Sequence, residues 1–287
     1  LATASGDIAV TAGTTITVDA GGAATSNGGD ITYTGEADVV VADVNASGAD
    51  ATATGSIAIT SVTGNVTVND EDADGIAVIT NGIRTIEINA AIDVQANANI
   101  ESELGSVTIT SGEATTQGTD VELATAGGDI AVNAGTTITV ETGGAATSNG
   151  GDITYTGEDD VIVGDVNASG ADATATGSIA ITSITGNVTV NDGDDDGIAV
   201  VTNGSGTVEI DAEIGVQVNA NIESATGNIS VTADAALVQG ADVELATAGG
   251  DISVTAGTTI TVDAGGAATS NGGDITYTGE TDVVVAD

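Results

Sequence analysis

Short runs in which every second residue is aliphatic recur along the whole chain, and a glycine and a small polar residue introduce most of them. The first run is 6–10, and the pattern returns at 29–33, 55–59, 105–109 and 128–132. Alternation with a period of two is typical of β-strands with one buried face. The segments between the runs are rich in glycine and asparagine, which are turn residues. Because no window shows helical spacing, the pattern predicts an all-β protein without helices.

A longer period contains this shorter one. The sequence Leu-Ala-Thr-Ala at residues 1–4 returns at 123–126 and again at 245–248, which is a spacing of 122 residues each time. Long internal periods are typical of repeat proteins in which each unit packs against its neighbours. We therefore divide the chain into three parts of one continuous array. They are repeat unit 1 at 1–122, repeat unit 2 at 123–244 and the start of repeat unit 3 at 245–287.

Each 122-residue unit contains five copies of the glycine-led pattern. In the first unit they begin at residues 6, 29, 55, 84 and 105, so successive copies are 21 to 29 residues apart. The fourth copy lacks its glycine because Arg84 stands there, but Gly206 restores the pattern in the second unit. Each copy contains about three short alternating runs. The sequence thus predicts five coils of three strands in every unit.

Three short strands in each coil of 21–29 residues predict a right-handed parallel β-helix, a solenoid in which every coil stacks on the one before it. At about 4.8 Å for each coil, the segment would form a rod about 55–60 Å long. The chain begins and ends inside a repeat, and we expect it to be a segment of a longer protein. A string of β-sandwich domains of this period is the alternative fold.

Charge excludes several classes of partner. The net charge is −42, because 43 acidic residues face a single basic one, Arg84. Phosphate binding needs clustered lysine or arginine, so we expect neither nucleic acid nor an anionic membrane surface as a partner. No apolar run approaches the length of a membrane helix. The chain has no cysteine, so we expect backbone pairing and bound cations to supply its stability instead of disulfides.

The most specific local motif is an acidic turn that occurs once in each complete unit. Asp-x-Asp-x-Asp-Gly directs three carboxylates toward one point, and its glycine permits the bend, as at the start of a calcium loop. The twelfth position of such a loop would be Asn81 instead of glutamate, so the sequence predicts a calcium turn within a β-protein. A solvated acidic loop is the alternative. The predicted Ca²⁺ ligands are Asp70, Asp72 and Asp74 in unit 1 and Asp192, Asp194 and Asp196 in unit 2.

Other acidic residues receive different predictions. Polar residues follow the glycines that lead the coils, as at Asp7, Asp30 and Ser56, and we expect them to cap turns. A cation-binding row is the alternative for these positions. The clusters formed by 36–38 with Asp43, and by 158–160 with Asp165, are expected to keep the rod soluble and to suit it to saline water.

Two further residue types deserve separate interpretations. Tyr33, Tyr155 and Tyr277 occupy positions that valine or isoleucine holds in other coils, so we expect them to fill the core. Asparagines in Asn-x-Ser/Thr sequences match the acceptor pattern for glycosylation. Asn45 and its copy Asn167 are better candidates than Asn65 and Asn187, because Asn65 begins a predicted strand.

Strands of the Gly-Asp-Ile-Thr type, separated by Ala-Gly-Thr-Thr and Ala-Gly-Gly turns as in 128–144, resemble the repeats of filamentous-haemagglutinin-type secreted adhesins and autotransporter passenger domains. The resemblance covers the full chain but is compositional. It implies a secreted right-handed β-helical rod at a bacterial or archaeal surface. This chain departs from that family in its acidity and in its long, nearly identical repeat.

These observations predict a structural repeat segment of a long extracellular fibre, stalk or filament at a prokaryotic cell surface, stabilised by divalent cations. Its partners would be copies of itself, joined end to end or laterally through cations. The alternative is an adhesin module that binds a receptor or glycan through one face. We expect no enzyme, because histidine and lysine are absent and Arg84 is not repeated. Ice binding is also disfavoured, because threonine runs such as 14–17 occur once in each unit instead of once in each coil.

Overall fold

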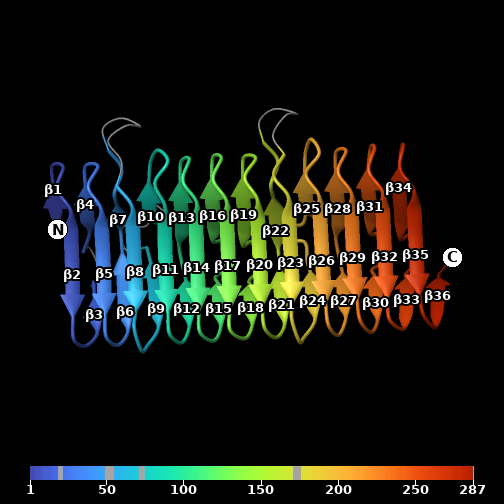
Figure 1. Cartoon of the computed structure of the whole chain (residues 1–287), viewed down its shortest axis with the longest axis horizontal. Coiled ribbons are helices and arrows are strands. Elements are labelled where there is room, and N and C mark those ends of the chain that lie inside the picture. The colour runs from blue at the N-terminus through green and yellow to red at the C-terminus, as the bar shows by residue number, and fades with distance from the viewer. Residues whose placement is uncertain (19–21, 49–54, 71–74, 171–175, 287) are drawn as a thin grey trace.

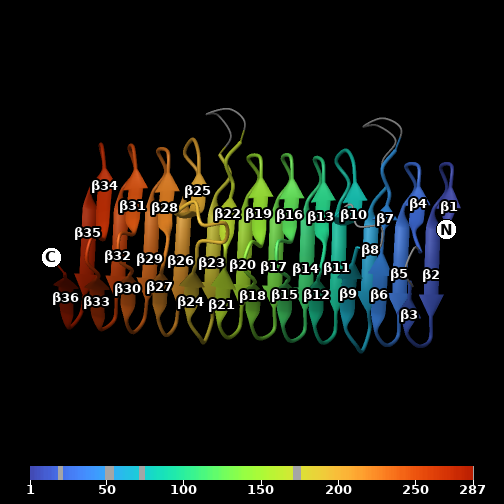
Figure 2. The ribbon, with the colours of Figure 1, turned by 180° about the vertical axis from the view of Figure 1, so that it is seen from behind.

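The computed structural model describes residues 1–18, 22–48, 55–70, 75–170 and 176–286. These residues form a parallel β-solenoid made of three 12-stranded sheets, A, B and C, and none of them is helical. Figures 1 and 2 show the coils side by side along the long axis, with the two termini at opposite ends. In each complete coil the chain passes from sheet B to sheet C and then to sheet A.

Sheet B carries the strands that the glycine-led pattern predicts. Within each strand the side chains alternate between buried and outward positions. The strands of sheet B are β2 (Ile8–Ala12), β5 (Ile31–Gly35), β8 (Ile57–Ser61), β11 (Ile86–Ala90), β14 (Val107–Ser111), β17 (Ile130–Ala134), β20 (Ile153–Gly157), β23 (Ile179–Ser183), β26 (Val208–Ala212), β29 (Ile229–Ala233), β32 (Ile252–Ala256) and β35 (Ile275–Gly279).

Sheets C and A are built from shorter strands. Those of sheet C are β3 (Ile16–Thr17), β6 (Val39–Ala42), β9 (Val66–Asn69), β12 (Val94–Ala96), β15 (Thr115–Gln117), β18 (Ile138–Val140), β21 (Val161–Val163), β24 (Val188–Val190), β27 (Val216–Val218), β30 (Leu237–Gln239), β33 (Thr259–Val262) and β36 (Asp282–Val285). Those of sheet A are β1 (Ala2–Thr3), β4 (Ala24–Ser26), β7 (Val44–Asn45), β10 (Ile76–Thr80), β13 (Asn99–Ser102), β16 (Glu122–Thr125), β19 (Ala145–Ser148), β22 (Asp165–Asn167), β25 (Ile198–Thr202), β28 (Asn221–Ser224), β31 (Glu244–Thr247) and β34 (Ala267–Ser270).

The predicted fold class is confirmed. All pairings between neighbouring coils are parallel, whereas a β-sandwich would pair its strands antiparallel. Strand β11 follows Arg84 and lies between β8 and β14, so the fourth coil is present although its leading glycine is missing. Strands β2 and β17 begin 122 residues apart and five coils apart, at Ile8 and Ile130. One unit therefore advances the rod by about 24 Å.

Register changes occur at one place in each unit. Sheet B pairs residue for residue through all its coils, because its five-residue strands have equal lengths. In sheet A the pairing shifts between Ile76 and Val78, and again between Ile198 and Val200. Both shifts directly follow the acidic turn. The strand that follows the turn, β10 or β25, therefore contains one residue more than its partner at this point.

The core is a narrow column of valine, isoleucine and alanine side chains that the three sheets enclose. Tyr33 and Tyr155 lie in it with 2% and 1% exposure, as the sequence predicts for core-filling residues. The hydroxyl of Tyr155 donates to Oε1 of the buried Gln117, 3.2 Å away, and Tyr277 repeats this contact with Gln239 at 2.7 Å. Burial raises the pKa of the Tyr155 hydroxyl above its ordinary value.

Most leading glycines lie where the main chains of neighbouring coils touch, and Arg84 holds this position in the fourth coil. A Cβ atom at Gly151 would collide with the carbonyl oxygen of Gly128, and one at Gly55 would collide with that of Gly29. Gly13 lies in a different turn, and a Cβ atom there would meet no other atom. The repeated glycine therefore reflects the close stacking of one corner of the solenoid.

Candidate metal centre

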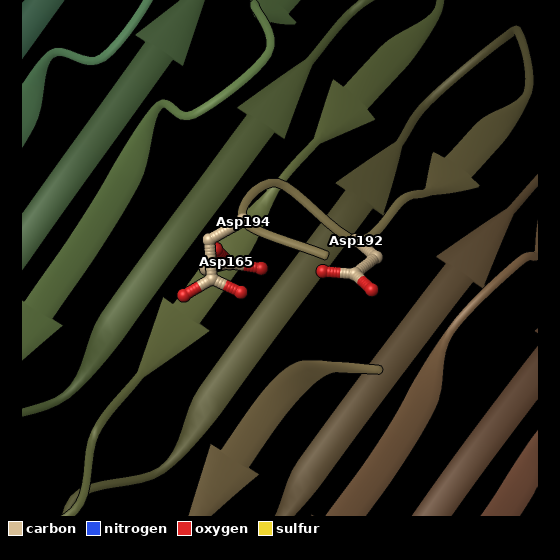
Figure 3. A group of neighbouring side chains, drawn as sticks. All are labelled: Asp165, Asp192 and Asp194. Carbon is tan, nitrogen blue, oxygen red and sulfur yellow. The ribbon is translucent and has the colours of Figure 1, made fainter. Parts of the chain in front are cut away.

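The acidic turn of unit 2, residues 191–197, connects β24 in sheet C with β25 in sheet A. It brings Asp192 and Asp194 near Asp165, the first residue of β22, which is the neighbour of β25 in sheet A. One carboxylate oxygen from each of these residues lies within 4.8 Å of the others. Figure 3 shows the three side chains gathered beside the turn. We call Asp165, Asp192 and Asp194 the three-aspartate group.

Asp192 both closes the turn and contributes an unused ligand atom. Its Oδ2 accepts a hydrogen bond from the main-chain N–H of Gly197 at 2.8 Å, which folds the turn back on itself. Gly197 has φ +91°, a conformation that favours glycine. Oδ1 of Asp192 is buried and receives no hydrogen bond from any described residue. A buried acceptor without a donor costs free energy, and a bound cation would remove that cost.

The main chain of the acidic turn holds the Asp165 side chain in place. Its Oδ1 accepts a hydrogen bond from the N–H of Gly193 at 3.0 Å. Burial raises the pKa of the Asp165 carboxyl, and the charges of Asp194, Asp192 and Asp196 raise it further, against the opposing effect of the Gly193 hydrogen bond. Carboxylates that repel one another in a partly buried place favour either a proton or a metal ion between them.

The structure places the predicted ligands of unit 2 in two different surroundings. Asp192 and Asp194 belong to the three-aspartate group, whereas Asp196 does not. Oδ1 of Asp196 accepts from the N–H of Ile198 at 2.8 Å, so this side chain caps the start of β25. Oδ1 of Asp194 accepts from the N–H of Asp196 at 3.0 Å while the side chain stays exposed.

Asp165 is the member of the group that sequence reasoning assigned elsewhere, to a solubility cluster. It lies one coil before the turn, so a search for consecutive ligands misses it. The stacking of the coils could have indicated Asp165 as a ligand. A sheet A strand that begins with aspartate in one coil lies beside the acidic turn of the next coil. Asp43 occupies the same place in unit 1.

The acidic turn of unit 1 has the same closure where it is described. Oδ2 of Asp70 accepts from the N–H of Gly75 at 2.8 Å, and Gly75 has φ +89°. These values match those of Asp192 and Gly197 in unit 2. The other two predicted ligands of unit 1, Asp72 and Asp74, lie outside the described residues.

The donor set of the three-aspartate group selects a class of metal. Three carboxylates and no nitrogen or sulfur ligand suit hard cations such as Ca²⁺, Mg²⁺ or Mn²⁺ and disfavour zinc or copper. The chain has neither histidine nor cysteine to offer. Ca²⁺ takes six to eight oxygens, so main-chain carbonyls or water would complete its shell. The residues present therefore fit a hard divalent cation.

Carboxylates at the corner before sheet B are arranged differently. Oδ1 of Asp7 accepts from the N–H of Asp30 at 3.0 Å, and Oδ1 of Asp30 accepts from the N–H of Ser56 at 2.8 Å. The series repeats from Asp129 to Asp152 and from Asp152 to Ser178. We call this row the frame ladder. Its side chains cap main-chain groups, but the group they cap belongs to the next coil instead of their own turn.

Among the described residues, no helix has the length and apolar character needed to cross a bilayer. Fold and repeat together define a parallel β-solenoid repeat protein, compatible with β-helical repeat proteins in general. Comparisons with models of protein families, with curated proteins and with solved structures found no match. Any narrower assignment therefore depends on the residues themselves.

Proposed function

We propose that this chain is a structural repeat segment of a long extracellular fibre, stalk or filament at a prokaryotic cell surface, and that divalent cations stabilise it. The observation that carries the proposal is the unbroken register of sheet B through every coil. Because equivalent strands recur after five coils, each added unit continues the same core without a joint. Such an array extends in length while its cross-section stays constant.

The acidic turn is the feature that supports cation binding. The turn interrupts the register of sheet A once in each unit, and its carboxylates repel one another. A hard divalent cation held by the three-aspartate group would join β22 and β25 through the turn. Calcium is the ion that we propose, because carboxylates contributed by an irregular turn and a strand suit its variable coordination geometry.

The surface charge bears on how rods would assemble. With a net charge of −42, identical rods repel one another at neutral pH. Lateral bundling therefore requires cations between the rods, whereas joining end to end depends on sheet edges. We propose copies of the same chain as partners and an extracellular, saline setting, in which such cations are abundant.

An adhesin module is the second candidate, and shallow grooves on sheet A favour it. One groove includes Ile79, Glu101 and Ala124, and another includes their equivalents Val201, Glu223 and Ala246. A depression that recurs on the same face of both units could bind repeated features of a receptor or glycan. Loss of surface attachment after Glu101→Gln and Glu223→Gln, with rod length unchanged, would favour this candidate.

Small-angle X-ray scattering of arrays with one, two and three complete units tests the proposed rod. The maximum dimension should increase by about 24 Å with each unit while the cross-sectional radius stays constant. Electron microscopy of native material with and without a calcium chelator tests the fibre. Globular particles, or a length that does not grow with unit number, would contradict the structural role, and filaments unchanged by chelation would contradict the role of calcium.

A further inference from the structure

The Asn-x-Ser/Thr sequences of this chain have unequal positions in the fold. Six asparagines among the described residues match this pattern, and they differ in what their side-chain nitrogen does. The six are Asn45, Asn65, Asn167, Asn187, Asn203 and Asn228. An oligosaccharide joined to that nitrogen needs an outward direction and a nitrogen that the fold does not require as a donor.

Three of the six use the side-chain nitrogen as a hydrogen-bond donor between coils. Nδ2 of Asn65 donates to Asp38 Oδ1 at 3.2 Å, and Nδ2 of Asn187 donates to Asp160 Oδ1 at 3.0 Å. Nδ2 of Asn203 donates to the carbonyl oxygen of Gly170 at 2.5 Å. A sugar on any of these nitrogens would have to fit between adjacent coils, about 4.8 Å apart. The fold therefore disfavours modification at these three positions.

Asn228 is exposed, but it belongs to the frame ladder. Its Oδ1 accepts from the N–H of Asp251 at 2.8 Å, which fixes the side chain against the next coil. Its equivalent in unit 1 is Ser106, whose hydroxyl accepts a hydrogen bond from the main-chain N–H of Asp129. A bulky group on Asn228 would press against the neighbouring members of the ladder.

Asn45 and Asn167 are placed differently from the other four. Asn45 ends β7, and its neighbours Val44 and Ala46 are both fully buried, so alternation directs Asn45 outward from sheet A. Asn167 ends β22 in the same way, between the buried Val166 and Ala168. Neither side-chain nitrogen makes a hydrogen bond in the described part of the chain. Sheet B resumes only at Ile57 after the first of these strands and at Ile179 after the second.

The acceptor sequence has a defined local shape at both places. Oδ1 of Asn45 accepts from the N–H of Ser47 at 2.8 Å, and Asn167 repeats this contact with Ser169 at the same distance. The bond uses the side-chain oxygen, so the nitrogen is not needed to close the turn. In the described part of the chain the Ser47 hydroxyl is buried and makes no hydrogen bond.

We propose that Asn45 and Asn167 are N-glycosylated, which places one glycan on the sheet A face of each complete unit. Nδ2 would attack the anomeric carbon of an oligosaccharide carried on a lipid pyrophosphate. The new C–N bond replaces the C–O bond to phosphate, Nδ2 loses one proton, and the lipid pyrophosphate leaves. Successive glycans would lie about 24 Å apart along the rod. This inference rests on the secreted character in the proposed function.

Peptide mass spectrometry of the chain secreted by its native source tests the inference. Because Arg84 is the only basic residue, an aspartate-specific protease is the suitable reagent. We expect hexose- or hexosamine-containing mass additions on the peptides that carry Asn45 and Asn167, and none on those that carry the other four asparagines. An unmodified Asn45 or Asn167, or a glycan on any of the other four, would overturn the inference.

Variants at the third position provide a matched control in a secretory host that attaches N-linked glycans. Ser47→Ala should remove the addition at Asn45 and leave that at Asn167, while Ser47→Thr should retain both. Retention of the Asn45 addition in Ser47→Ala would overturn the inference, as would its absence from the parent chain. The growth of rod length with unit number is independent of these masses, so either proposal can fail while the other stands.

Discussion

The frame ladder and the acidic turn use the same side chain for opposite purposes. In the ladder, Oδ1 of Asp152 accepts from the N–H of Ser178 at 2.8 Å, and each carboxylate is one coil away from the next. In the turn, one oxygen from each of Asp165, Asp192 and Asp194 lies within 4.8 Å of the others. The ladder gives each charge a main-chain donor, whereas the turn leaves a buried oxygen of Asp192 without one.

This difference shows that acidity alone does not identify a metal site in such a chain. A carboxylate that spans two coils acts as a hydrogen-bond acceptor and is satisfied by the fold. A carboxylate that faces two others also meets their repulsion, which a proton or a cation relieves. The acidic turn of unit 2 lies in the longest coil of its unit, 177–205, and this turn brings side chains from two coils toward one point.

The largest effect is expected where the ladder corner requires close contact. Gly151→Ala places a Cβ atom against the carbonyl oxygen of Gly128. Because main chain cannot move aside as a side chain can, we expect a loss of about 3 kcal/mol in the free energy of unfolding. Urea denaturation measures it. Gly13→Ala is the control, with open space at the new atom, and an equal loss in both variants would show that close stacking is not the cause.

A cation should stabilise the chain through the three-aspartate group. With free Ca²⁺ at one hundred times its dissociation constant, one site contributes about 2.7 kcal/mol. Asp192→Asn should lose that contribution while unfolding almost normally in chelator. Thermal unfolding with and without Ca²⁺ measures both. If Ca²⁺ raises the unfolding temperature equally in the variant and in the parent, Asp192 is not a ligand.

Ladder carboxylates should contribute as acceptors and not as charges. Asp152→Ala removes the acceptor for the Ser178 N–H and should cost about 1 kcal/mol of unfolding free energy. Asp152→Asn keeps an oxygen at the same place and should remain close to the parent. If the asparagine variant loses as much unfolding free energy as the alanine variant, the ladder requires the negative charge of the carboxylate.

The smallest effect is a pH dependence of the turn without divalent cations. Burial and the neighbouring carboxylates raise the pKa of Asp165 above its ordinary value. The folded state therefore holds this proton more tightly than the unfolded state does, and its contribution to stability is lost as pH rises through the raised pKa. In chelator, Asp165→Asn should flatten the decline in stability just above the ordinary carboxyl pKa. Urea midpoints of both chains across that range measure it, and parallel pH profiles would contradict the assignment.

The period-two alternation predicted the strands of sheet B, and the spacing of 21–29 residues between its copies predicted the parallel stacking. Five-residue runs such as that of β17 bury alternate residues, and the copy in unit 2 revealed the coil that Arg84 obscures. The composition of the three-aspartate group could not be predicted in the same way. Asp165 is distant in sequence from Asp192, and only the register between β22 and β25 brings them together.

The consecutive motif also misleads about Asp196. Its spacing suggests a third ligand, but a short turn has main-chain N–H groups of its own to satisfy, and the Ile198 N–H takes this carboxylate. The frame ladder, at the corner before sheet B, also differs from what the sequence predicts. Sequence reasoning expected turn caps there, and the structure shows that the capped N–H lies one coil further along.

Calcium binding to the parent chain, Asp192→Asn and Asp152→Asn tests the central contrast most directly. Equilibrium dialysis at fixed ionic strength measures the number of Ca²⁺ ions bound by each. Asp192→Asn should bind one Ca²⁺ fewer than the parent, and Asp152→Asn should bind the same number. Equal losses in both variants, or no binding by the parent, would contradict the claim that the acidic turn holds a cation and the frame ladder does not.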